Sequence, residues 1–375
     1  MKILLTGGGT GGHFYPLIAV AQEIKNIIYE QKLIEAKIYY MSDDPYDLEM
    51  LRGNDITFIK IRAGKIRRYF SLRNFIDPFK TIWGVVMAIG KLFVIYPDVV
   101  FSKGGYASFP ALWAARLLRI PVFIHESDSH PGRANLWAGK FARRIALSYP
   151  EAMNYFPSEK TAVTGNPIRK EILYPVKEGA HKFLELSPQK PVILVIGGSQ
   201  GSVNINNTIL DILPQLVEKY QIIHQTGKAN WQEIKSRSQV ILTDNKNSLN
   251  YKPFPYLNDL ALRMAAGATD LVITRAGSVI FEIAYWEIPS IIIPIPKNVS
   301  HDQYTNAFTY ARSGGAVVIE ENNLTSSVLL SEINRLLEDP ILLAEMKAGT
   351  RTFTKPNAGR VIAEEIVKIA LKHES

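Results

Sequence analysis

Short apolar runs alternate with longer segments of mixed polarity along this 375-residue chain. In the first half, β-branched and aromatic runs predict strands at residues 3–5, 37–41, 57–61, 99–102, 122–125 and 145–147. In the second half, similar runs predict strands at residues 192–196, 222–225, 271–274, 290–294 and 316–319. Helix-length segments separate these runs, and residues 14–24 and 203–213 predict helices. Strands that alternate with helices indicate an α/β fold, with parallel sheets covered on both faces.

Two glycine-rich turns each lie between a predicted strand and a predicted helix. The first reads GGGTGGH at residues 7–13, and the second reads GGSQG at residues 197–201, about half a chain further on. In such a turn, free backbone N–H groups and the positive end of a helix dipole face the same point, which suits a phosphate. A tight strand-to-helix turn without a ligand is the alternative. Neither turn is a P-loop, because GxxxxGK[ST] is missing.

The repeated strand, turn and helix predicts two doubly wound domains in tandem. The boundary is expected in the turn-forming stretch at residues 164–167 or in the polar segment that follows it, and we assign domains of residues 1–165 and 166–354. The helical apolar pattern near the end predicts a last helix, within residues 355–375, that packs back on the first domain. Open sheets of this kind bind ligands at the carboxyl ends of their strands.

The composition is that of a folded protein, with 47% hydrophobic and 21% charged residues. The chain contains no cysteine, which excludes disulfides and thiolate metal sites and fits a reducing cytoplasm. A predicted strand follows Met1 almost directly, so we expect no signal peptide. The longest apolar run, residues 81–96, contains Lys91 and is shorter than the ~20 residues of a membrane span.

A net charge of +8 predicts an anionic partner. Residues 60–76 contain no acidic residue and the following basic ones: Lys60, Arg62, Lys65, Arg67, Arg68 and Arg73. Bulky apolar residues, such as Phe70 and Phe75, are interleaved with them. Such a mixture suits the headgroup and acyl boundary of an anionic membrane surface. A solvated basic loop is the alternative.

Signatures of several other enzyme classes are missing, including GxSxG, HExxH and a Cys/His metal set. Asp43 and Asp44 follow a predicted strand and could imitate a carboxylate pair that holds Mg²⁺. A solvated loop that caps the next helix is the better interpretation of these acids. We therefore expect no metal and no cofactor, and we expect helix N-termini and basic side chains to stabilise leaving-group charge.

Seven motifs follow one another along the chain: GGGTGGHFYP at 7–16, FSKGGYASFP at 101–110, HESDSHPGRAN at 125–135, TGNPIR at 164–169, GGSQGSVNIN at 197–206, RAGSVIFE at 275–282 and HDQYTNA at 301–307. Together they resemble the N-acetylglucosamine transferases of bacterial peptidoglycan synthesis in glycosyltransferase family 28. GKIRRYFSL at 64–72 resembles the branch of this family found in low-GC Gram-positive bacteria.

The resemblance implies a GT-B fold, with two doubly wound Rossmann-like domains facing across a cleft. It implies an inverting hexosyltransferase that moves N-acetylglucosamine from UDP-N-acetylglucosamine to the 4-hydroxyl of the muramoyl sugar of undecaprenyl-diphospho-muramoylpentapeptide. The donor is expected in the second domain and the acceptor in the first. The implied partners are these two substrates and an anionic membrane surface, not nucleic acid. The implied location is peripheral, on the cytoplasmic face of the bacterial cell membrane.

The matched motifs supply candidate residues in the first domain. His13 and Glu126 are the candidate bases for the attacking hydroxyl, and His13 could instead bind a phosphate or only cap its helix. The positions matched to donor contacts in the first loop are Thr10, Gly11 and Gly12, and those matched to the acceptor side are Tyr106 and Asn135.

Further matched positions lie on the donor side. They are Arg169 and Ser199 for the diphosphate, Leu257 for the uracil edge, Glu282 for the ribose hydroxyls and Gln303 for the sugar hydroxyls. Taken alone, Ser199 as a helix N-cap and Glu282 as a first-turn acid would be sufficient explanations.

The chain departs from the family pattern in two places. Asp128 stands where many members have an amide, so that donor contact is not transferred to it. RAGSVIFE is one residue shorter than the usual spacing, which leaves the contacts of residues 276–280 open.

Alternative functions remain at the level of the sequence. Another GT-B enzyme that acts on a lipid, such as a diacylglycerol sugar transferase, or an epimerase with this fold would share most of these features. A nicotinamide-dependent oxidoreductase is disfavoured, because Asp43 and Asp44 lie roughly 30 residues past the glycines rather than about 20. A non-catalytic sugar-nucleotide binder is disfavoured by the presence of both candidate bases.

Overall fold

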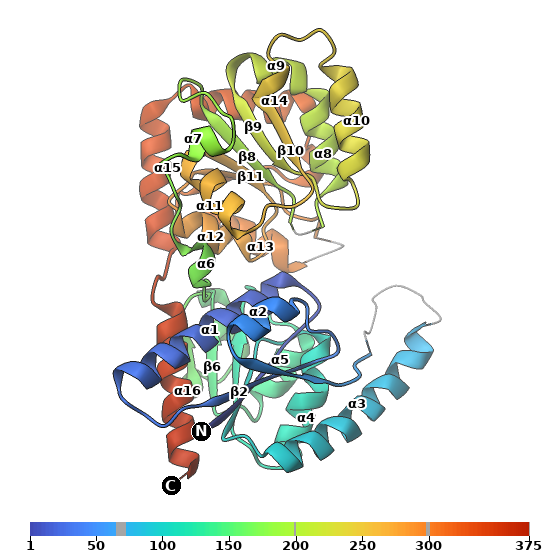
Figure 1. Ribbon diagram of the computed structural model, residues 1–375, viewed down its shortest axis with the longest axis vertical. Coiled ribbons are helices and arrows are strands. Elements are labelled where there is room, and N and C mark those ends of the chain that lie inside the picture. Colours follow the sequence, from blue (N-terminus) through green and yellow to red (C-terminus); the bar gives the residue numbers. More distant parts are fainter. Residues whose placement is uncertain (65–72, 199, 298–300, 375) are drawn as a thin grey trace. The chain divides into compact units, whose positions relative to one another are not determined.

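The computed structural model describes residues 1–64, 73–198, 200–297 and 301–374, and it divides the chain into two compact units (Figure 1). Unit 1 comprises Met1–Arg169 and Lys355–Ser375, and unit 2 comprises Lys170–Thr354. Unit 1 thus extends past residue 165, where the sequence pattern placed the boundary. The physical reason is that Asn166 and Arg169 are buried, with side-chain contacts to other residues of unit 1.

Unit 1 contains a parallel sheet of seven strands in the order β3-β2-β1-β4-β5-β6-β7. The strands are β1 (Lys2–Thr6), β2 (Lys37–Ser42), β3 (Ile56–Lys60), β4 (Val99–Ser102), β5 (Val122–Glu126), β6 (Arg144–Leu147) and β7 (Thr161–Val163). Its helices are α1 (Gly11–Glu30), α2 (Leu48–Gly53), α3 (Arg73–Ile95), α4 (Phe109–Leu117), α5 (Arg133–Gly139) and α16 (Ala358–Glu374). Short 3-10 turns lie at Tyr106–Ser108, Pro150–Tyr155 and Ser158–Lys160.

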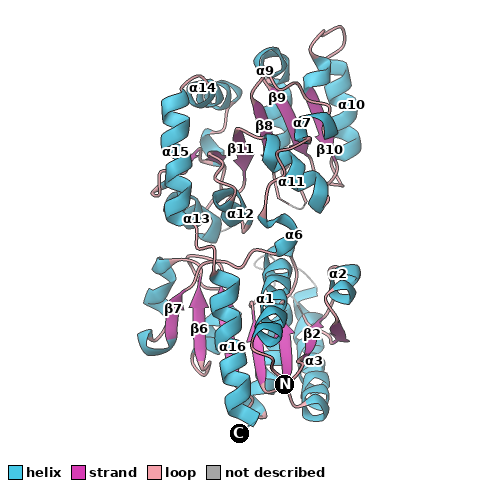
Figure 2. Cartoon of the chain, turned by 60° about the vertical axis from the view of Figure 1, so that its left-hand side comes forward, coloured by secondary structure: helices cyan, strands magenta, loops and turns pink. Residues whose placement is uncertain are grey.

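Two cores lie on the two faces of this sheet. Ile3 and Leu5 of β1 join one core and Leu4 joins the other, because successive side chains of a strand point to opposite faces. The first core also contains residues of α1 and of α16, which pack against each other although they lie at opposite ends of the chain (Figures 1 and 2). The second core contains residues of α3, α4 and α5.

Unit 2 contains a parallel sheet of six strands in the order β10-β9-β8-β11-β12-β13. The strands are β8 (Val192–Ile196), β9 (Gln221–Gln225), β10 (Tyr251–Phe254), β11 (Leu271–Thr274), β12 (Ser290–Ile292) and β13 (Ala316–Val318). The helices are α6 (Lys170–Leu173), α7 (Ala180–Phe183), α8 (Val203–Asp211), α9 (Leu213–Lys219), α10 (Trp231–Ile241), α11 (Asp259–Ala268), α12 (Val279–Tyr285), α13 (His301–Ala311), α14 (Ser326–Leu337) and α15 (Pro340–Phe353). Two 3-10 turns lie at Ser248–Asn250 and Glu321–Asn323.

The predicted α/β class is confirmed, and every predicted apolar run forms a strand. Two strands escaped prediction, β7 and β10. Both are edge strands, and β10 contains Pro253, which is tolerated where one side of the strand has no ladder partner. The single helix predicted at residues 203–213 is wrong in length: α8 ends at Asp211, and α9 begins at Leu213 with Pro214 in its first turn.

Candidate active site

In unit 1, the loops that follow β1, β4 and β5 lie together at the carboxyl edge of the sheet. These strands are neighbours, so residues 7–12, 103–106 and 127–132 emerge side by side. The three loops come from three of the motifs identified in the sequence. The carboxyl edge is where open α/β sheets bind ligands.

The first glycine loop, residues 7–12, interlocks with the turn after β4. Gly9 has a φ of +95°, and a Cβ there would lie 3.0 Å from the ring of Tyr106. A Cβ on Gly105 would lie 2.8 Å from the backbone oxygen of Gly8. The hydroxyl of Tyr106 donates to Oδ2 of Asp43 at 2.8 Å. Glycine is therefore required where these two loops approach each other.

Thr10, Gly11 and Gly12 form the N-terminus of α1. The helix begins at Gly11, and Thr10 precedes it in an extended conformation. The first backbone N–H groups of a helix have no carbonyl partner within the helix. Such groups, together with the helix dipole, can bind an anion.

His13 lies in the first turn of α1, and its two ring nitrogens have different surroundings. Nδ1 is 3.0 Å from Oγ1 of Thr10, and Nε2 lies 3.7 Å from the position of a Cβ on Gly105. Burial and, to a smaller extent, the ammonium of Lys103 lower the pKa of His13 to about 4, against the opposing effect of the carboxylate of Asp128. The imidazole is therefore neutral near pH 7, which is the form that accepts a proton.

Glu126, the second candidate base, ends β5 and is buried. Its Oε1 accepts from the backbone N–H of Asp128 at 2.9 Å. Its Oε2 accepts from the N–H of Gly132 at 3.0 Å and from Nδ2 of Asn135 at 2.9 Å. Burial and the nearby Asp128 raise the pKa of Glu126 to about 7, against the opposing effect of these three donors. Both oxygens thus hold the loop after β5 in place, and neither faces solvent.

Asn135 of α5 is likewise part of this framework. It also donates to the backbone oxygen of His125 at 3.1 Å. Its amide packs under Gly104, where φ is +85° and a Cβ would lie 2.7 Å from Nδ2. Asn135 therefore connects the turn after β4 with the end of β5.

Arg169, the last residue of the first segment of unit 1, is also buried. Its guanidinium lies 4.0 Å from the centre of the ring of Tyr15, a cation–π contact with α1. The positive charge is thus fixed beside the N-terminal half of α1.

Sequence patterns did not identify Lys103, which follows β4 within the matched motif and is 1% exposed. Nζ donates to Nδ1 of His125 at 2.5 Å and to Oδ1 of Asn166 at 2.8 Å. Nε2 of His125 donates to the backbone oxygen of Gly165 at 3.0 Å. A lysine in a turn motif is usually exposed, so only the folded arrangement reveals this buried network.

In unit 2, the second glycine loop follows β8 and again lies at a carboxyl edge. Gly198 and Gly201 have φ values of +98° and +77°. A Cβ on Gly201 would overlap the backbone oxygen of Thr226, so this loop packs directly on the turn after β9. The N-cap of α8 is Ser202, whose Oγ accepts from the N–H of Ile205. Ser199 lies outside the described residues.

Gln225, at the end of β9, is a second residue that sequence patterns missed. It is 5% exposed; Nε2 donates to the backbone oxygen of Gly198 at 3.3 Å, and Oε1 accepts from the N–H of Leu257 at 2.9 Å. The side chain therefore joins the second glycine loop to the segment matched to uracil recognition. The N–H of Leu257 is engaged within the protein by this contact.

Arg275 follows β11 and connects the turn before α12 with two other segments of unit 2. It donates to Oε2 of Glu321 at 2.6 Å and to Oγ of Ser202 at 2.7 Å. Burial of Glu321 opposes ionisation, but hydrogen bonds from Arg275 and Asn204 leave its pKa lowered. Glu282 is partly buried in the first turn of α12. The arginine of the shortened motif thus ties the turn after β11 to the N-cap of α8 and to Glu321.

Gln303 lies in the first turn of α13. Its Oε1 is buried and has no hydrogen-bond partner among the described residues. A buried oxygen of this kind is costly unless a donor reaches it. A sugar hydroxyl would be such a donor.

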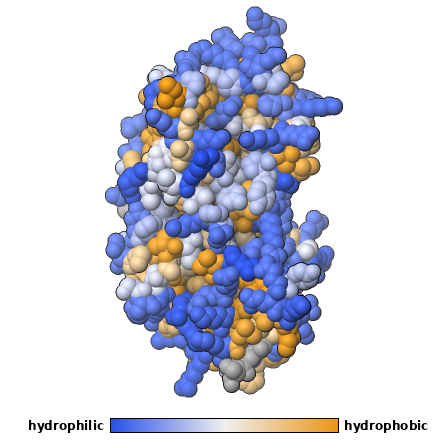
Figure 3. All heavy atoms as spheres, turned by 90° about the vertical axis from the view of Figure 1, so that its left-hand side faces the viewer, coloured by the Kyte–Doolittle hydropathy of each residue, from blue (hydrophilic) through white to orange (hydrophobic). Residues whose placement is uncertain are grey.

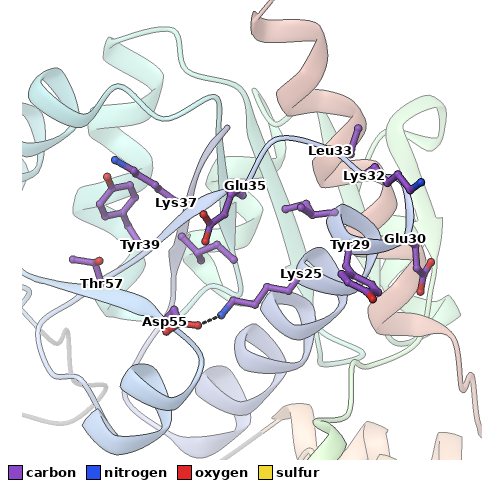
Figure 4. Close-up of a pocket in the computed structure, with 13 residues that line it drawn as sticks. Lys25, Tyr29, Glu30, Lys32, Leu33, Glu35, Lys37, Tyr39, Asp55 and Thr57 are labelled. Atoms are coloured by element: carbon purple, nitrogen blue, oxygen red, sulfur yellow. Dashed lines mark hydrogen bonds and ion pairs between the residues drawn. The ribbon is translucent and has the colours of Figure 1, made fainter.

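Two further features concern metal binding and a surface hollow. Within the described ranges, no three His, Asp or Glu side chains converge in a way that could hold a metal ion. A hollow of about 1150 Å³ is lined by the end of α1 and the starts of β2 and β3, where Lys25 pairs with Asp55 at 2.6 Å (Figure 4). It lies at the amino ends of the strands, opposite to the glycine loop, and holds charges of both signs.

Comparisons with known proteins agree with this arrangement. The glycosyltransferase family 28 N-terminal domain matches residues 3–147, and the glycosyltransferase family 28 C-terminal domain matches residues 192–362. The UDP-N-acetylglucosamine–N-acetylmuramyl-(pentapeptide) pyrophosphoryl-undecaprenol N-acetylglucosamine transferase of Clostridium botulinum (strain 657 / Type Ba4) is 38% identical over 340 residues, covering 90% of this chain and 91% of that protein.

Solved structures give the same result. The crystal structure of MurG from Acinetobacter baumannii has a TM-score of 0.73 and 27% identity, covering 98% of this chain and 99% of that one. A UDP-GlcNAc 2-epimerase from Neisseria meningitidis, bound to UDP-GlcNAc, has a TM-score of 0.70 and 17% identity, covering 98% of this chain and 100% of that one. The second similarity concerns the fold alone.

Proposed function

The chain belongs to glycosyltransferase family 28 and, within it, to the N-acetylglucosamine transferases of peptidoglycan synthesis; from this we propose its reaction. It transfers N-acetylglucosamine from UDP-N-acetylglucosamine to the muramoyl sugar of undecaprenyl-diphospho-muramoylpentapeptide. The observation that carries the proposal is the 38% identity over 90% of the chain to an enzyme of that name, because such a match includes both units.

We assign the acceptor and the attack to unit 1. Nε2 of His13 takes the proton of the attacking 4-hydroxyl while Nδ1–H donates to Oγ1 of Thr10, which fixes the tautomer. His13 is preferred to Glu126, because both oxygens of Glu126 are occupied within its own loop. A bond forms from the acceptor oxygen to the anomeric carbon, and the bond from that carbon to the diphosphate oxygen breaks with its electron pair.

We assign the donor mainly to unit 2. The N-terminus of α8 and the second glycine loop provide backbone donors for the diphosphate. Glu282 binds the ribose hydroxyls, and the unpartnered oxygen of Gln303 accepts from a hydroxyl of the sugar. Leu257 reads the uracil edge through its carbonyl, since its N–H is held by Gln225. Thr10, Gly11, Gly12 and Arg169 add positive potential for the leaving diphosphate.

We further propose that unit 1 attaches to an anionic membrane surface through α3. Within the described residues, only Asp77–Ile95 of α3 is long and apolar enough to cross a membrane. The helix is longer than the apolar run in the sequence, because it begins at Arg73 and continues through Pro78. Ala88 and Leu92 are fully buried in a core shared with α4, so protein covers one face of α3. A helix covered in this way lies along a surface instead of spanning the bilayer.

The other face of α3 is apolar and open. Phe79, Ile82 and Phe93 are 73%, 63% and 70% exposed. The acceptor's polyprenyl chain stays in the bilayer, so the enzyme must come to it. The basic segment expected to add electrostatic attraction lies mainly in residues 65–72, outside the described residues; Lys60 and Arg62, just before it, are exposed.

The test of the reaction is a transfer assay with the full chain, UDP-N-acetylglucosamine and lipid-linked muramoylpentapeptide in detergent. We expect disaccharide product and released UDP in equal amounts, and a loss of kcat of about 10²–10⁴-fold in His13→Ala. His181→Ala, which removes a histidine of α7 in unit 2, is the control and should keep full activity. Epimerised sugar nucleotide in place of disaccharide would contradict the proposal.

The same assay tests the expectation that no metal is required. EDTA should leave turnover within about twofold, because helix ends and Arg169 stabilise the leaving diphosphate. A loss greater than about tenfold that Mg²⁺ or Mn²⁺ restores would show that the site uses a cation.

A further inference from the structure

Lys103 is a buried cation that the proposed reaction does not use directly. It is 1% exposed and lies at the end of β4, between the first glycine loop and the end of β5. A Cβ on Gly7 would lie 3.2 Å from the Cβ of Lys103, so its stem supports the start of the glycine loop. A buried ammonium is retained only where polar partners surround it.

The partners of Lys103 belong to two other segments of unit 1. Nζ donates to His125 at 2.5 Å and to Asn166 at 2.8 Å, and His125 in turn donates to the backbone oxygen of Gly165 at 3.0 Å. Ser148, at the end of β6, lies 3.3 Å from the same nitrogen of His125. One ammonium therefore joins the end of β4, the end of β5 and the segment that leads to the chain's first crossing into unit 2.

Two carboxylates, Glu126 and Asp128, lie one and three residues after His125. Glu126 accepts hydrogen bonds from its own segment, as described above, and its charge opposes the effect of burial on the pKa of Lys103. Asp128 is partly buried, and its charge raises the pKa of both His13 and Lys103. The charged groups that act on His13 in unit 1 are thus Lys103, from the end of β4, and Asp128, from the loop after β5.

We propose that Lys103 is a positioning residue for the transfer: it fixes the two loops that frame His13 and, with Asp128, sets the charge around it. The proposal rests on the assignment of His13 as the base. Lys103 is covered by protein and touches neither substrate. Asp128, at a position where many family members carry an amide, supplies the opposite charge in this chain.

The proposal has a consequence for pH dependence. Burial lowers the pKa of Lys103 to about 7, so Lys103 is cationic at the lower pH where His13 gains its proton. Removing this cation raises the pKa of His13, and the acid limb of kcat/KM moves to higher pH. Removing the carboxylate of Asp128 lowers the pKa of His13, and the limb moves to lower pH.

The test is the pH profile of kcat/KM for the acceptor in four full-length variants: Lys103→Met, Lys103→Arg, Asp128→Asn, and the double variant Lys103→Met with Asp128→Asn. We expect the limb to move up by about 0.5 pH unit or more in the first, and down in the third. Lys103→Arg should keep the wild-type limb, and the double variant should return toward it. Lys103→Met should also lower kcat about tenfold with little change in donor affinity, since geometry rather than donor binding is lost.

Several outcomes separate this proposal from its alternatives. Limbs that stay in place, or move in the same direction in Lys103→Met and Asp128→Asn, would overturn it and leave Lys103 as a packing residue. If thermal unfolding shows that Lys103→Met does not fold, Asp128→Asn and Lys103→Arg decide the question. Asp128→Asn keeps the buried ammonium, and Lys103→Arg replaces it with another cation. Wild-type activity in His13→Ala would refute the assignment of the base instead. Absence of transfer by the wild type would refute the proposed function itself.

Discussion

At the scale of single residues, the two candidate bases differ in what their polar atoms already contact. Glu126 accepts two hydrogen bonds from its own loop and one from Asn135 of α5, whereas one nitrogen of His13 faces a glycine. The same comparison applies in unit 2, where the nitrogen and the oxygen of the Gln225 amide both bond to the protein and Gln303 has a buried oxygen without a described partner. Residues with a hydrogen-bonding atom that the protein leaves without a partner are the better candidates for substrate contacts.

Glu282 gives a prediction at this scale. Glu282→Ala should weaken binding of UDP-N-acetylglucosamine by about 1–3 kcal/mol, because the ribose hydroxyls lose a charged acceptor. Isothermal titration calorimetry of the full chain measures the change. Glu338→Ala removes a carboxylate that forms an exposed ion pair with Lys219, and it should leave the affinity unchanged. Equal loss in both variants, or no loss in the first, would remove Glu282 from the donor site.

At the scale of elements, sequence patterns predicted the strands, which depend on local residues, and missed the side-chain networks that join distant segments. Strands such as Val192–Ile196 are buried throughout, so they read as continuous apolar runs. In unit 1, the order of the strands brings the loops after β1, β4 and β5 together, and the alternation of strands and helices predicts a ligand site at that carboxyl edge. The partners of Lys103 lie 22 and 63 residues away in the sequence, so no local pattern could reveal them.

The exposed face of α3 gives a prediction for one element. A variant with Phe79→Ser, Ile82→Ser and Phe93→Ser should bind anionic vesicles at least about tenfold more weakly, because burial of large apolar side chains at the acyl boundary is lost. The loss should be greatest at high salt, where electrostatic attraction is screened and apolar contact is not. Vesicle sedimentation at several salt concentrations measures both parts.

Matched changes elsewhere serve as the control for α3. Ile341→Ser and Val240→Ser replace apolar side chains of unit 2 that are 74% and 75% exposed, and they should leave vesicle binding unchanged. The face shown in Figure 3, over α15 and α16, is largely hydrophilic, with apolar side chains scattered among polar ones. Equal loss in both sets of variants would mean that α3 has no special role at the membrane.

At the scale of the whole molecule, the two units differ in how the chain builds them. Unit 2 is one continuous segment with its own core, whereas unit 1 needs α16 from beyond unit 2. The buried residues Ile362, Ile366, Val367 and Ile369 of α16 together contribute roughly 6–12 kcal/mol, which is comparable with the stability of a whole domain.

This difference predicts the behaviour of fragments. Residues 170–354 alone should unfold cooperatively and bind UDP-N-acetylglucosamine within about tenfold of the full chain, because only the contacts from unit 1 are missing. A chain that stops at residue 354 should lose the cooperative unfolding of unit 1 and keep that of unit 2. Calorimetric melting of both fragments checks this. Two unchanged transitions in the truncated chain would contradict the role of α16.

The place of α16 in unit 1 also determines the order of events on the ribosome. Domains usually fold in the order in which they are synthesised. Here the N-terminal part of unit 1 emerges first, but the core between α1 and its sheet stays incomplete until all of unit 2 and then α16 have emerged. We therefore expect unit 2 to complete its fold first. Until α16 emerges, unit 1 exposes apolar surface, and this is the stage at which chaperones would be needed.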